Sequence, residues 1–118
     1  MTKTFEIYKL IEASRSLDKL IQQDLNYNIQ VSYNLIKTKR EIETAIDYVM
    51  ERFAMLCGQD VDFDNLDEGQ KNMLNALLSQ SVDIEIPNIA IDQLINTENV
   101  NATPSDVDNI MYIFEKRD

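Results

Sequence analysis

The first half of the chain carries the apolar pattern of an amphipathic helix. Apolar or small side chains return at steps of three and four residues, and charged side chains occupy positions between them. The members of this series are Ile7, Leu10, Ile11, Ser14, Leu17, Leu20 and Ile21. Asn26, Tyr27 and Asn28 then interrupt the pattern with residues that favour turns and helix caps. The spacing therefore predicts a helix that is followed by a turn.

A second, longer helix is predicted from Asn28 or Ile29 to Gly58, which has the position and chemistry of a helix-ending glycine. A helix of about 28 residues is about 42 Å long. Its apolar residues form a narrow seam, defined as Leu35, Ile42, Val49 and Leu56 at a spacing of seven, with Ile46 and Phe53 beside them. We expect the two helices to form an antiparallel hairpin over residues 4–58, with the seam packed against the first helix.

The second half of the chain alternates short elements with polar connectors. Residues 59–66 form an acidic connector, and Asp67 with Gln70 fits a capping box that opens a short helix. The expected buried face of this helix consists of Met73, Leu74, Leu77 and Leu78. Residues 82–86 then alternate between apolar and acidic side chains, which is the period of a strand. Because the proline that follows cannot lie in a central strand, residues 82–91 form either a small hairpin or one bent edge strand.

The end of the chain carries the signals of one more helix. Residues 96–102 are polar and lack periodicity, so we expect a mobile loop there. Thr103 supplies a helix cap and Pro104 the first helical position. The expected buried face of this last helix consists of Val107, Ile110, Met111 and Phe114.

These elements together predict a mainly α fold with a minor β component. A chain of 118 residues is long enough for one core, and two are not expected at this size. We therefore expect a single domain, residues 1–118. Its antiparallel helical hairpin (4–58) is followed by an acidic α/β half (59–118), which holds a short helix, a small strand or hairpin and a C-terminal helix.

The net charge of −10 is confined to the second half of the chain. Residues 1–58 contain 8 basic and 8 acidic residues, whereas residues 59–118 contain 3 basic and 13 acidic residues. Nucleic acid is a poor partner for such a surface, because phosphate binding requires basic residues. A basic protein surface would be attracted to it. In the alternative interpretation the charge serves solubility alone.

The composition also excludes several kinds of catalytic and metal site. The chain has no histidine and one cysteine, which removes Ser-His and Cys-His catalysis, zinc and iron–sulfur sites and any internal disulfide. Two glycines do not make a phosphate-binding loop. No apolar run approaches the roughly 20 residues of a membrane span, and no signal peptide is recognisable. We expect a protein without enzymatic activity or cofactor, in a reducing intracellular compartment.

Three aspartates of the acidic connector have the spacing of the first ligands in an EF-hand loop. Asp60, Asp62 and Asp64 alternate as those ligands do. Asn65, however, stands where the sharp turn needs glycine, and Lys71 stands where the bidentate glutamate must be. The sequence therefore argues against a calcium site and indicates a solvated acidic linker.

The candidate partner-binding residues lie mostly in this connector or directly after it. These are Tyr27, Asp60, Asp62, Asp64, Asp67 and Glu68. The acidic members would attract a basic partner. Tyrosine is enriched at interfaces, and Tyr27 is the one most expected to be exposed, because it lies in the turn between the long helices. The alternative for Tyr27 is half-buried packing with its hydroxyl in water.

The second helix also carries two candidates for reactive sites. Cys57 ends an apolar run just before Gly58, so a buried and inert thiol is expected. A set of four carboxylates has helical spacings that could present a pair, and it consists of Glu41, Glu43, Asp47 and Glu51. Without histidine beside them, these carboxylates are expected to be solvated on the outer face of the helix.

Three segments carry a resemblance to a known family. They are residues 28–33 at the start of the long helix, residues 77–94 around the alternating strand, and residues 103–107 at the start of the last helix. In this order of elements the chain resembles a family of small, acidic, uncharacterised bacteriophage and prophage proteins with a long helical hairpin. The resemblance implies no enzymatic activity and supplies no functional residues. The outline is also similar to that of prefoldin-like subunits, but there the strands lie between the hairpin helices.

The resemblance and the composition lead to two functional hypotheses. In the first, the chain is a non-enzymatic phage protein that acts by protein–protein interaction, in particle assembly or as a minor virion component. In the second, it is an acidic inhibitor that imitates nucleic acid and blocks a host nucleic-acid enzyme. We expect a protein partner, basic in character, and neither nucleic acid nor membrane. Self-association through the hairpin is a further expectation, and the expected location is the host cytoplasm or the virion.

Overall fold

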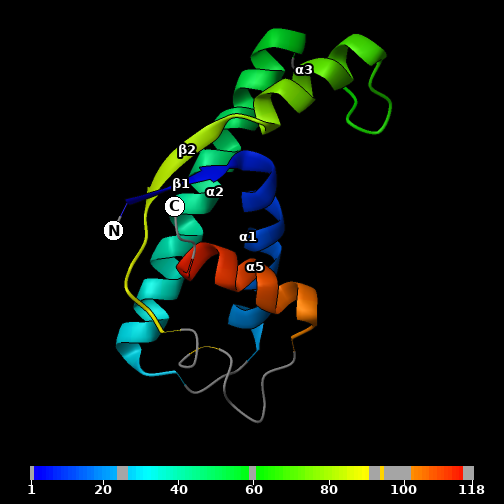
Figure 1. The fold of residues 1–118 in the computed structure, drawn as a ribbon. Helices are drawn as coiled ribbons and strands as arrows, with labels where there is room; N and C mark the ends of the chain where they lie inside the picture. Colours follow the sequence, from blue (N-terminus) through cyan, green and yellow to red (C-terminus); the bar gives the residue numbers. More distant parts are fainter. Residues whose placement is uncertain (1, 24–26, 59–60, 91–93, 95–101, 116–118) are drawn as a thin grey trace.

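The long helix α2 is the axis of the molecule (Figure 1). The computed structural model describes residues 2–23, 27–58, 61–90, 94 and 102–115. In chain order the elements are β1 (Thr2–Glu6), α1 (Ile7–Gln22), α2 (Ile29–Cys57), α3 (Glu68–Leu78), β2 (Ser81–Glu85) and α5 (Pro104–Phe114). The fold is mainly helical with one small antiparallel sheet, so the expected fold class is confirmed.

Both ends of α2 are fixed by residues that the sequence places there. The side chain of Asn28 accepts a hydrogen bond from the backbone N–H of Val31 at 2.8 Å. At the other end Gly58 has a φ of 94°, where a side chain would be strained, and its N–H donates to the carbonyl of Ala54 at 2.8 Å. The 29 residues between them span about 43 Å, close to the 46 Å length of the molecule. The predicted bounds of this helix are confirmed.

Helix α1 runs antiparallel to α2, and α5 packs across another side of α1 (Figure 1). Because it has a helix on two sides, α1 buries a wide face. Ala13 and Ser16 are buried there as well as Leu10 and Leu17. The expected helical hairpin is present, and α1 is its most enclosed element.

The seam of α2 is buried over only part of its length. Leu35, Ile42 and Val49 are buried, but Leu56 keeps 53% of its surface exposed. Helix α1 begins at Ile7, which lines the same groove as Val49, so α1 does not accompany α2 to its end. The prediction that Leu56 belongs to the packed seam is therefore wrong.

A two-stranded antiparallel sheet packs on the hairpin. Strand β2 lies where the alternating pattern predicts a strand, but its partner is β1, with Lys3 opposite Ile84 and Phe5 opposite Val82. Residues 4–6, which were assigned to the helical hairpin, are therefore strand residues. The assignment was wrong because Phe5, the apolar residue of this stretch, packs in the core as part of the sheet and not as the first turn of α1.

The structure distinguishes the two alternatives for residues 82–91 as far as they are described. Residues 86–90 follow β2 without regular structure, so a single edge strand is present and no hairpin is found within residues 82–90. Residue 91 lies outside the described residues. The mobile loop expected over residues 96–102 also lies outside them, except for Ala102.

Capping boxes begin both short helices; the box of α3 and the threonine cap of α5 were predicted. The carboxylate of Asp67 accepts from the N–H of Gln70 at 2.7 Å, and the Gln70 side chain accepts from the N–H of Asp67 at 3.1 Å. Thr103 and Asp106 make the same reciprocal pair in α5, at 3.2 and 3.0 Å. Each box satisfies two N–H groups that a helix start leaves without an internal partner.

The buried faces of these two helices differ from those expected. In α3 Leu77 is buried, but Met73 is partly exposed although its sulfur contacts the Cys57 thiol, because only the end of α2 covers this side of α3. In α5 Ile113 is buried and Met111 is exposed, contrary to expectation. Residues two positions apart point about 200° apart on a helix, so a helix that buries Ile113 exposes Met111.

Helix α3 and the end of α2 project from the rest of the molecule (Figure 1). We call this projection the arm and define it as residues 50–58 and 61–78. The larger part of the molecule holds α1, α5, the sheet and the first part of α2. The arm is the part of the described chain with the least core around it.

Candidate functional site

The arm is held together by a small number of apolar contacts. The rings of Phe53 and Phe63 lie 5.5 Å apart between centroids. The thiol of Cys57 donates to the thioether sulfur of Met73 at 3.6 Å, which ties α2 to α3. Cys57 is half-buried against the core, so the expected burial of its thiol is present only in part. The cause is again that the end of α2 is covered on one side only.

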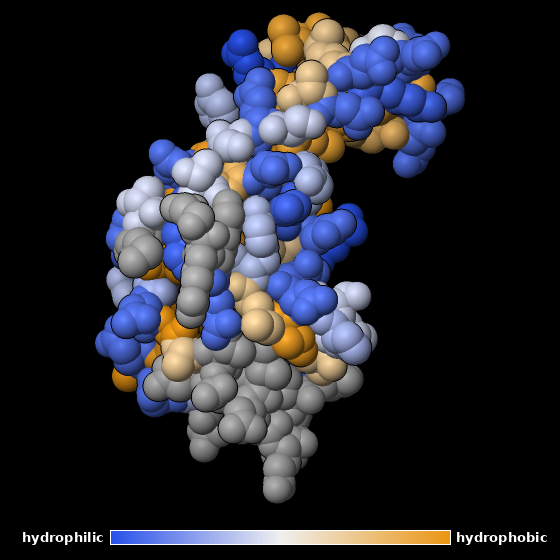
Figure 2. All heavy atoms as spheres, viewed as in Figure 1, coloured by the Kyte–Doolittle hydropathy of each residue, from blue (hydrophilic) through white to orange (hydrophobic). Residues whose placement is uncertain are grey.

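Apolar side chains gather at the surface of the arm. Met55 has 83% of its surface exposed, and Leu56, Phe63 and Met73 are exposed as well. Figure 2 shows hydrophobic surface at the end of the arm, beside strongly hydrophilic surface on the flank that carries α3. Methionine is flexible and polarisable, and it is frequent on surfaces that adapt to a partner. Exposed apolar residues gathered in one region are typical of an interaction site.

The predicted acidic residues lie on the same arm. Asp62, Asp64, Asp67 and Glu68 are all exposed, whereas Asp60 lies outside the described residues. The Asp62 carboxylate accepts from the N–H of Asp64 at 3.0 Å, and the Asp62 carbonyl accepts from the N–H of Asn65 at 3.1 Å. This turn fixes the carboxylates of the connector on the outside of the arm. The structure therefore brings the acidic candidates together with exposed apolar residues.

Asp67 differs from the other acidic candidates because it has a structural role. Its carboxylate accepts from the N–H of Gln70 and caps α3, where the helix dipole also favours a negative charge. Asp62, Asp64 and Glu68 are the described acidic candidates that remain for a partner. Among the described residues, no group of three or more cysteine, aspartate or glutamate side chains could hold a metal ion.

Tyr27 does not lie where the sequence predicts it. Its ring is half-buried, and its hydroxyl donates to the backbone carbonyl of Leu94 at 2.6 Å. Burial raises the pKa of Tyr27 to about 12. The prediction of an exposed partner anchor is therefore wrong. The half-buried packing of the alternative is present, but the hydroxyl bonds to a backbone carbonyl and not to water. The sequence could not show this, because Leu94 is 67 residues away. Tyr33 and Tyr48, both on α2, are the strongly exposed tyrosines among the described residues.

The carboxylates of α2 include one ion pair that joins the two long helices. The ammonium of Lys39 lies 2.5 Å from Asp18 of α1 and 3.3 Å from Glu43 of α2. The hydrogen bond to Asp18, together with that to Glu43, raises the pKa of Lys39 against the opposing effect of burial. Asp47 and Glu51 are exposed. These carboxylates thus act in surface pairs or face solvent.

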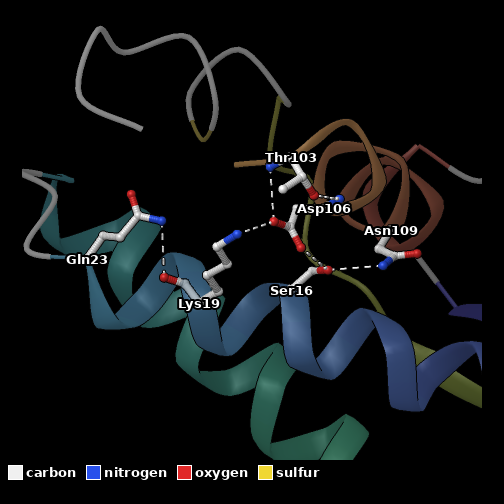
Figure 3. Close-up of polar contacts among 6 residues, drawn as sticks. All are labelled: Ser16, Lys19, Gln23, Thr103, Asp106 and Asn109. Atoms are coloured by element: carbon white, nitrogen blue, oxygen red, sulfur yellow. Dashed lines mark hydrogen bonds and ion pairs between the residues drawn. The ribbon is translucent and has the colours of Figure 1, made fainter. Parts of the chain in front are cut away.

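A polar cluster between α1 and α5 was missed by sequence analysis (Figure 3). Asp106 accepts from the Lys19 ammonium at 2.7 Å, from the Ser16 hydroxyl at 3.0 Å and from the Thr103 N–H at 3.0 Å. The amide of Asn109 donates to the Ser16 hydroxyl at 3.0 Å. Lys19 holds the pKa of Asp106 well below its usual range, and the Thr103 N–H adds to this effect.

This cluster joins two helices, and its groups are engaged with one another. Ser16 is buried, and the adjoining cavity has no room for a substrate. Its hydroxyl already has a donor and an acceptor partner. The sequence marks the start of α5 by Thr103 and Pro104, but it gives no sign of the contact between Asp106 and Ser16, which are 90 residues apart.

Asp106→Asn is expected to lower the free energy of unfolding by about 1–2 kcal/mol near neutral pH, because hydrogen bonds to a charged group are lost. The pKa of Asp106 is lower in the folded protein than in the unfolded chain. The contribution of its charge to the free energy of unfolding is therefore fully present above about pH 5, and it declines below about pH 4, where the unfolded chain takes up a proton. Urea unfolding of wild type and variant should therefore differ less at about pH 3 than at about pH 7. The matched control is Asp108→Asn, which is exposed on the same helix and should cost less than about 0.5 kcal/mol. An equal difference at both pH values would contradict the role of the Asp106 charge.

No match to the chain was found among protein-family models, curated proteins or solved structures. Within the described part of the chain, no helix is both long enough and apolar enough to cross a membrane. The case for a function therefore rests on the surfaces of the chain itself.

Proposed function

We propose that the chain is a non-enzymatic protein that binds a basic surface of a partner protein through the arm. The observation that carries this proposal is the exposed apolar cluster of the arm, led by Met55 and Leu56, beside exposed carboxylates at Asp62, Asp64 and Glu68. The carboxylates would speed the encounter with a basic partner, and the apolar side chains would be covered in the complex. Both features lie on the part of the molecule that projects furthest from its core (Figure 2).

The biological setting that we propose is a bacteriophage or prophage. The support is the resemblance of residues 28–33, 77–94 and 103–107 to the small acidic phage family. The protein would act in particle assembly or as a minor virion component, in the host cytoplasm or in the particle. That it works by binding and not by catalysis is supported by its lack of histidine and its single cysteine, which is engaged with Met73.

The alternative, an acidic inhibitor that imitates nucleic acid, has less support. Imitation of a phosphate backbone would call for an acidic surface without apolar interruption, whereas the arm mixes carboxylates with Met55, Leu56 and Phe63. Self-association through the seam is also less supported, since Leu35, Ile42 and Val49 are already buried within one chain. A second copy would have to use the outer face of α2.

The test compares wild type with a variant that lacks three charges of the arm. Each is used to bind proteins from phage-producing cells. In the arm variant Asp62→Asn, Asp64→Asn and Glu68→Gln are combined. The matched control combines Glu12→Gln, Asp47→Asn and Asp108→Asn, which removes the same charge from exposed positions elsewhere. We expect the arm variant to lower the association rate with a captured partner at least tenfold at low salt and the control to change it by less than about twofold. The difference should fade toward about 0.5 M salt.

A second variant tests the apolar part of the arm. Met55→Gln with Leu56→Gln should speed dissociation of the same partner, with an unchanged circular-dichroism spectrum because both side chains are exposed. Equal partner recovery by wild type and by both arm variants would contradict the proposal. Mass spectrometry of purified particles and assembly intermediates tests the setting, and absence of the protein from both would exclude the assembly role.

A further inference from the structure

A groove of about 580 Å³ separates β2 from the middle of α2. One side is formed by the whole of β2, and the other by Arg40, Thr44 and Tyr48 of α2. Its lining is mostly apolar, with Val49 and Val82 among the contributors. Tyr48, which borders the groove, has 67% of its surface exposed. The volume lies in the range of ordinary ligand pockets, and the groove is distinct from the arm.

The strand beside this groove has an edge that no other described strand covers. Within the described part of the chain, the sheet consists of β1 and β2 alone. The N–H of Ile7 donates to the carbonyl of Gln80 at 3.0 Å, so Gln80 directs its backbone toward β1. In an antiparallel pair this direction alternates, and Val82 and Ile84 therefore also face β1. The backbone groups of Ser81 and Asp83 face the opposite edge.

From this edge and this groove we infer that β2 accepts an extended segment of a partner protein as a third strand. Such a segment would pair with the N–H and C=O groups of Ser81 and Asp83, and its alternate side chains would enter the apolar groove. Main-chain hydrogen bonds supply affinity in this mode of binding, and the groove supplies selectivity. The site is independent of the arm and of the function proposed for it.

The charges around the groove indicate which segment fits. The acidic lining residues are Glu41, Asp83 and Glu85, and the basic one is Arg40. Glu85 already has positive groups beside it, so Glu41 and Asp83 are the acidic groups that a basic segment would meet. On the exposed face of the sheet, the hydroxyl of Thr4 donates to Asp83 at 2.5 Å and that of Thr2 donates to Glu85 at 2.6 Å, which fixes both carboxylates in place. Opposite charges in cross-strand pairs stabilise a sheet, whereas like charges destabilise it. The occupant is therefore a segment in which basic and apolar residues alternate.

The same charges argue against a second copy of this chain as the occupant. Antiparallel pairing of β2 with another β2 about its centre would set Asp83 opposite Asp83. Acidic residues on an edge strand are a common means of preventing pairing between like chains. A basic residue of a partner segment, placed opposite Asp83, would instead be attracted to its carboxylate.

The experiment is a selection of peptides from a random library on the full chain, followed by fluorescence anisotropy. We expect enriched peptides that alternate basic and apolar residues, and protection of the Ser81 and Asp83 amides from hydrogen exchange when such a peptide binds. Asp83→Pro removes an N–H on the side away from β1, a position where an edge strand tolerates proline. It should weaken peptide binding at least tenfold.

Two further variants keep the test decisive. Thr44→Trp fills the groove from α2 without changing β2, and it should also weaken binding at least tenfold even where Asp83→Pro fails to fold. The arm variant, with Asp62→Asn, Asp64→Asn and Glu68→Gln combined, should bind the peptide within twofold of wild type, which separates this site from the arm. Failure to enrich alternating basic peptides, or equal binding by Thr44→Trp, would overturn the inference. A concentration-dependent dimer that Thr44→Trp abolishes would overturn it too, in favour of a second copy.

Discussion

Replacing Leu35 with alanine is expected to lower the free energy of unfolding by about 3–4 kcal/mol, and the same change at Leu56 by less than about 1 kcal/mol. Both leucines belong to the same seam of α2, at a spacing that predicts equal burial. In the structure Leu35 is 1% exposed and Leu56 is 53% exposed. Only the first change leaves a cavity, because only Leu35 is enclosed by packed neighbours.

Thermal or urea unfolding of the two variants measures this difference in stability. The comparison is controlled because both changes replace leucine with alanine in the same helix. Ile42→Ala or Val49→Ala should cost about 1–4 kcal/mol by the same mechanism. Asp62→Ala removes an exposed side chain of the arm and should cost less than about 0.5 kcal/mol. Equal losses at Leu35 and Leu56 would mean that the end of α2 is covered in solution, and the exposed apolar surface of the arm would then be absent.

The parts of the fold that could be predicted are those specified by neighbouring residues. Asn28 and Gly58 bound α2, and the two capping boxes bound the starts of α3 and α5, because each cap acts on N–H or C=O groups within a few residues of it. The seam could be predicted down to Val49 for the same reason, since it depends on the period of one helix. Local chemistry was sufficient for these elements.

The parts that could not be predicted depend on partners far away in the chain. Phe5 is a lone apolar residue among polar ones, and only its pairing with β2, opposite Val82, makes it part of a sheet. Ser16 gives no sign in the sequence of its contact with Asp106. Tyr27 has the local context of an exposed turn and is nevertheless half-buried, with its hydroxyl bonded to the Leu94 carbonyl. In each case the burial of a side chain was decided by an element that the local pattern does not contain.

The candidate sites divide in the same way. The acidic residues of the arm could be named from the sequence, because charge and turn chemistry are local. The exposure of Met55 and Met73 could not be predicted, since a methionine at helical spacing is typical of a core residue. The groove beside β2 required knowledge that β1 covers only one edge of that strand.

Phe5→Ala is expected to lower the free energy of unfolding by about 3–5 kcal/mol. Its ring is fully buried and meets the ring of Tyr112 edge-on, at 5.4 Å between centroids, so truncation removes an aromatic contact and leaves a cavity. Thr4→Ala, at the exposed neighbouring position of β1, is the matched control and should cost less than about 1 kcal/mol.

Hydrogen exchange adds a readout that separates the sheet from the helices in the same variant. Within the described residues β1 is the neighbour of β2 in the sheet, so loosening β1 should release the Val82 and Ile84 amides, which face it, before the amides of α1 and α2. If Phe5→Ala cost no more than Thr4→Ala, the N-terminal strand would not be part of the stable core. The groove would then lose the strand that holds β2 in place, and the inference of strand addition at its far edge would lose its basis.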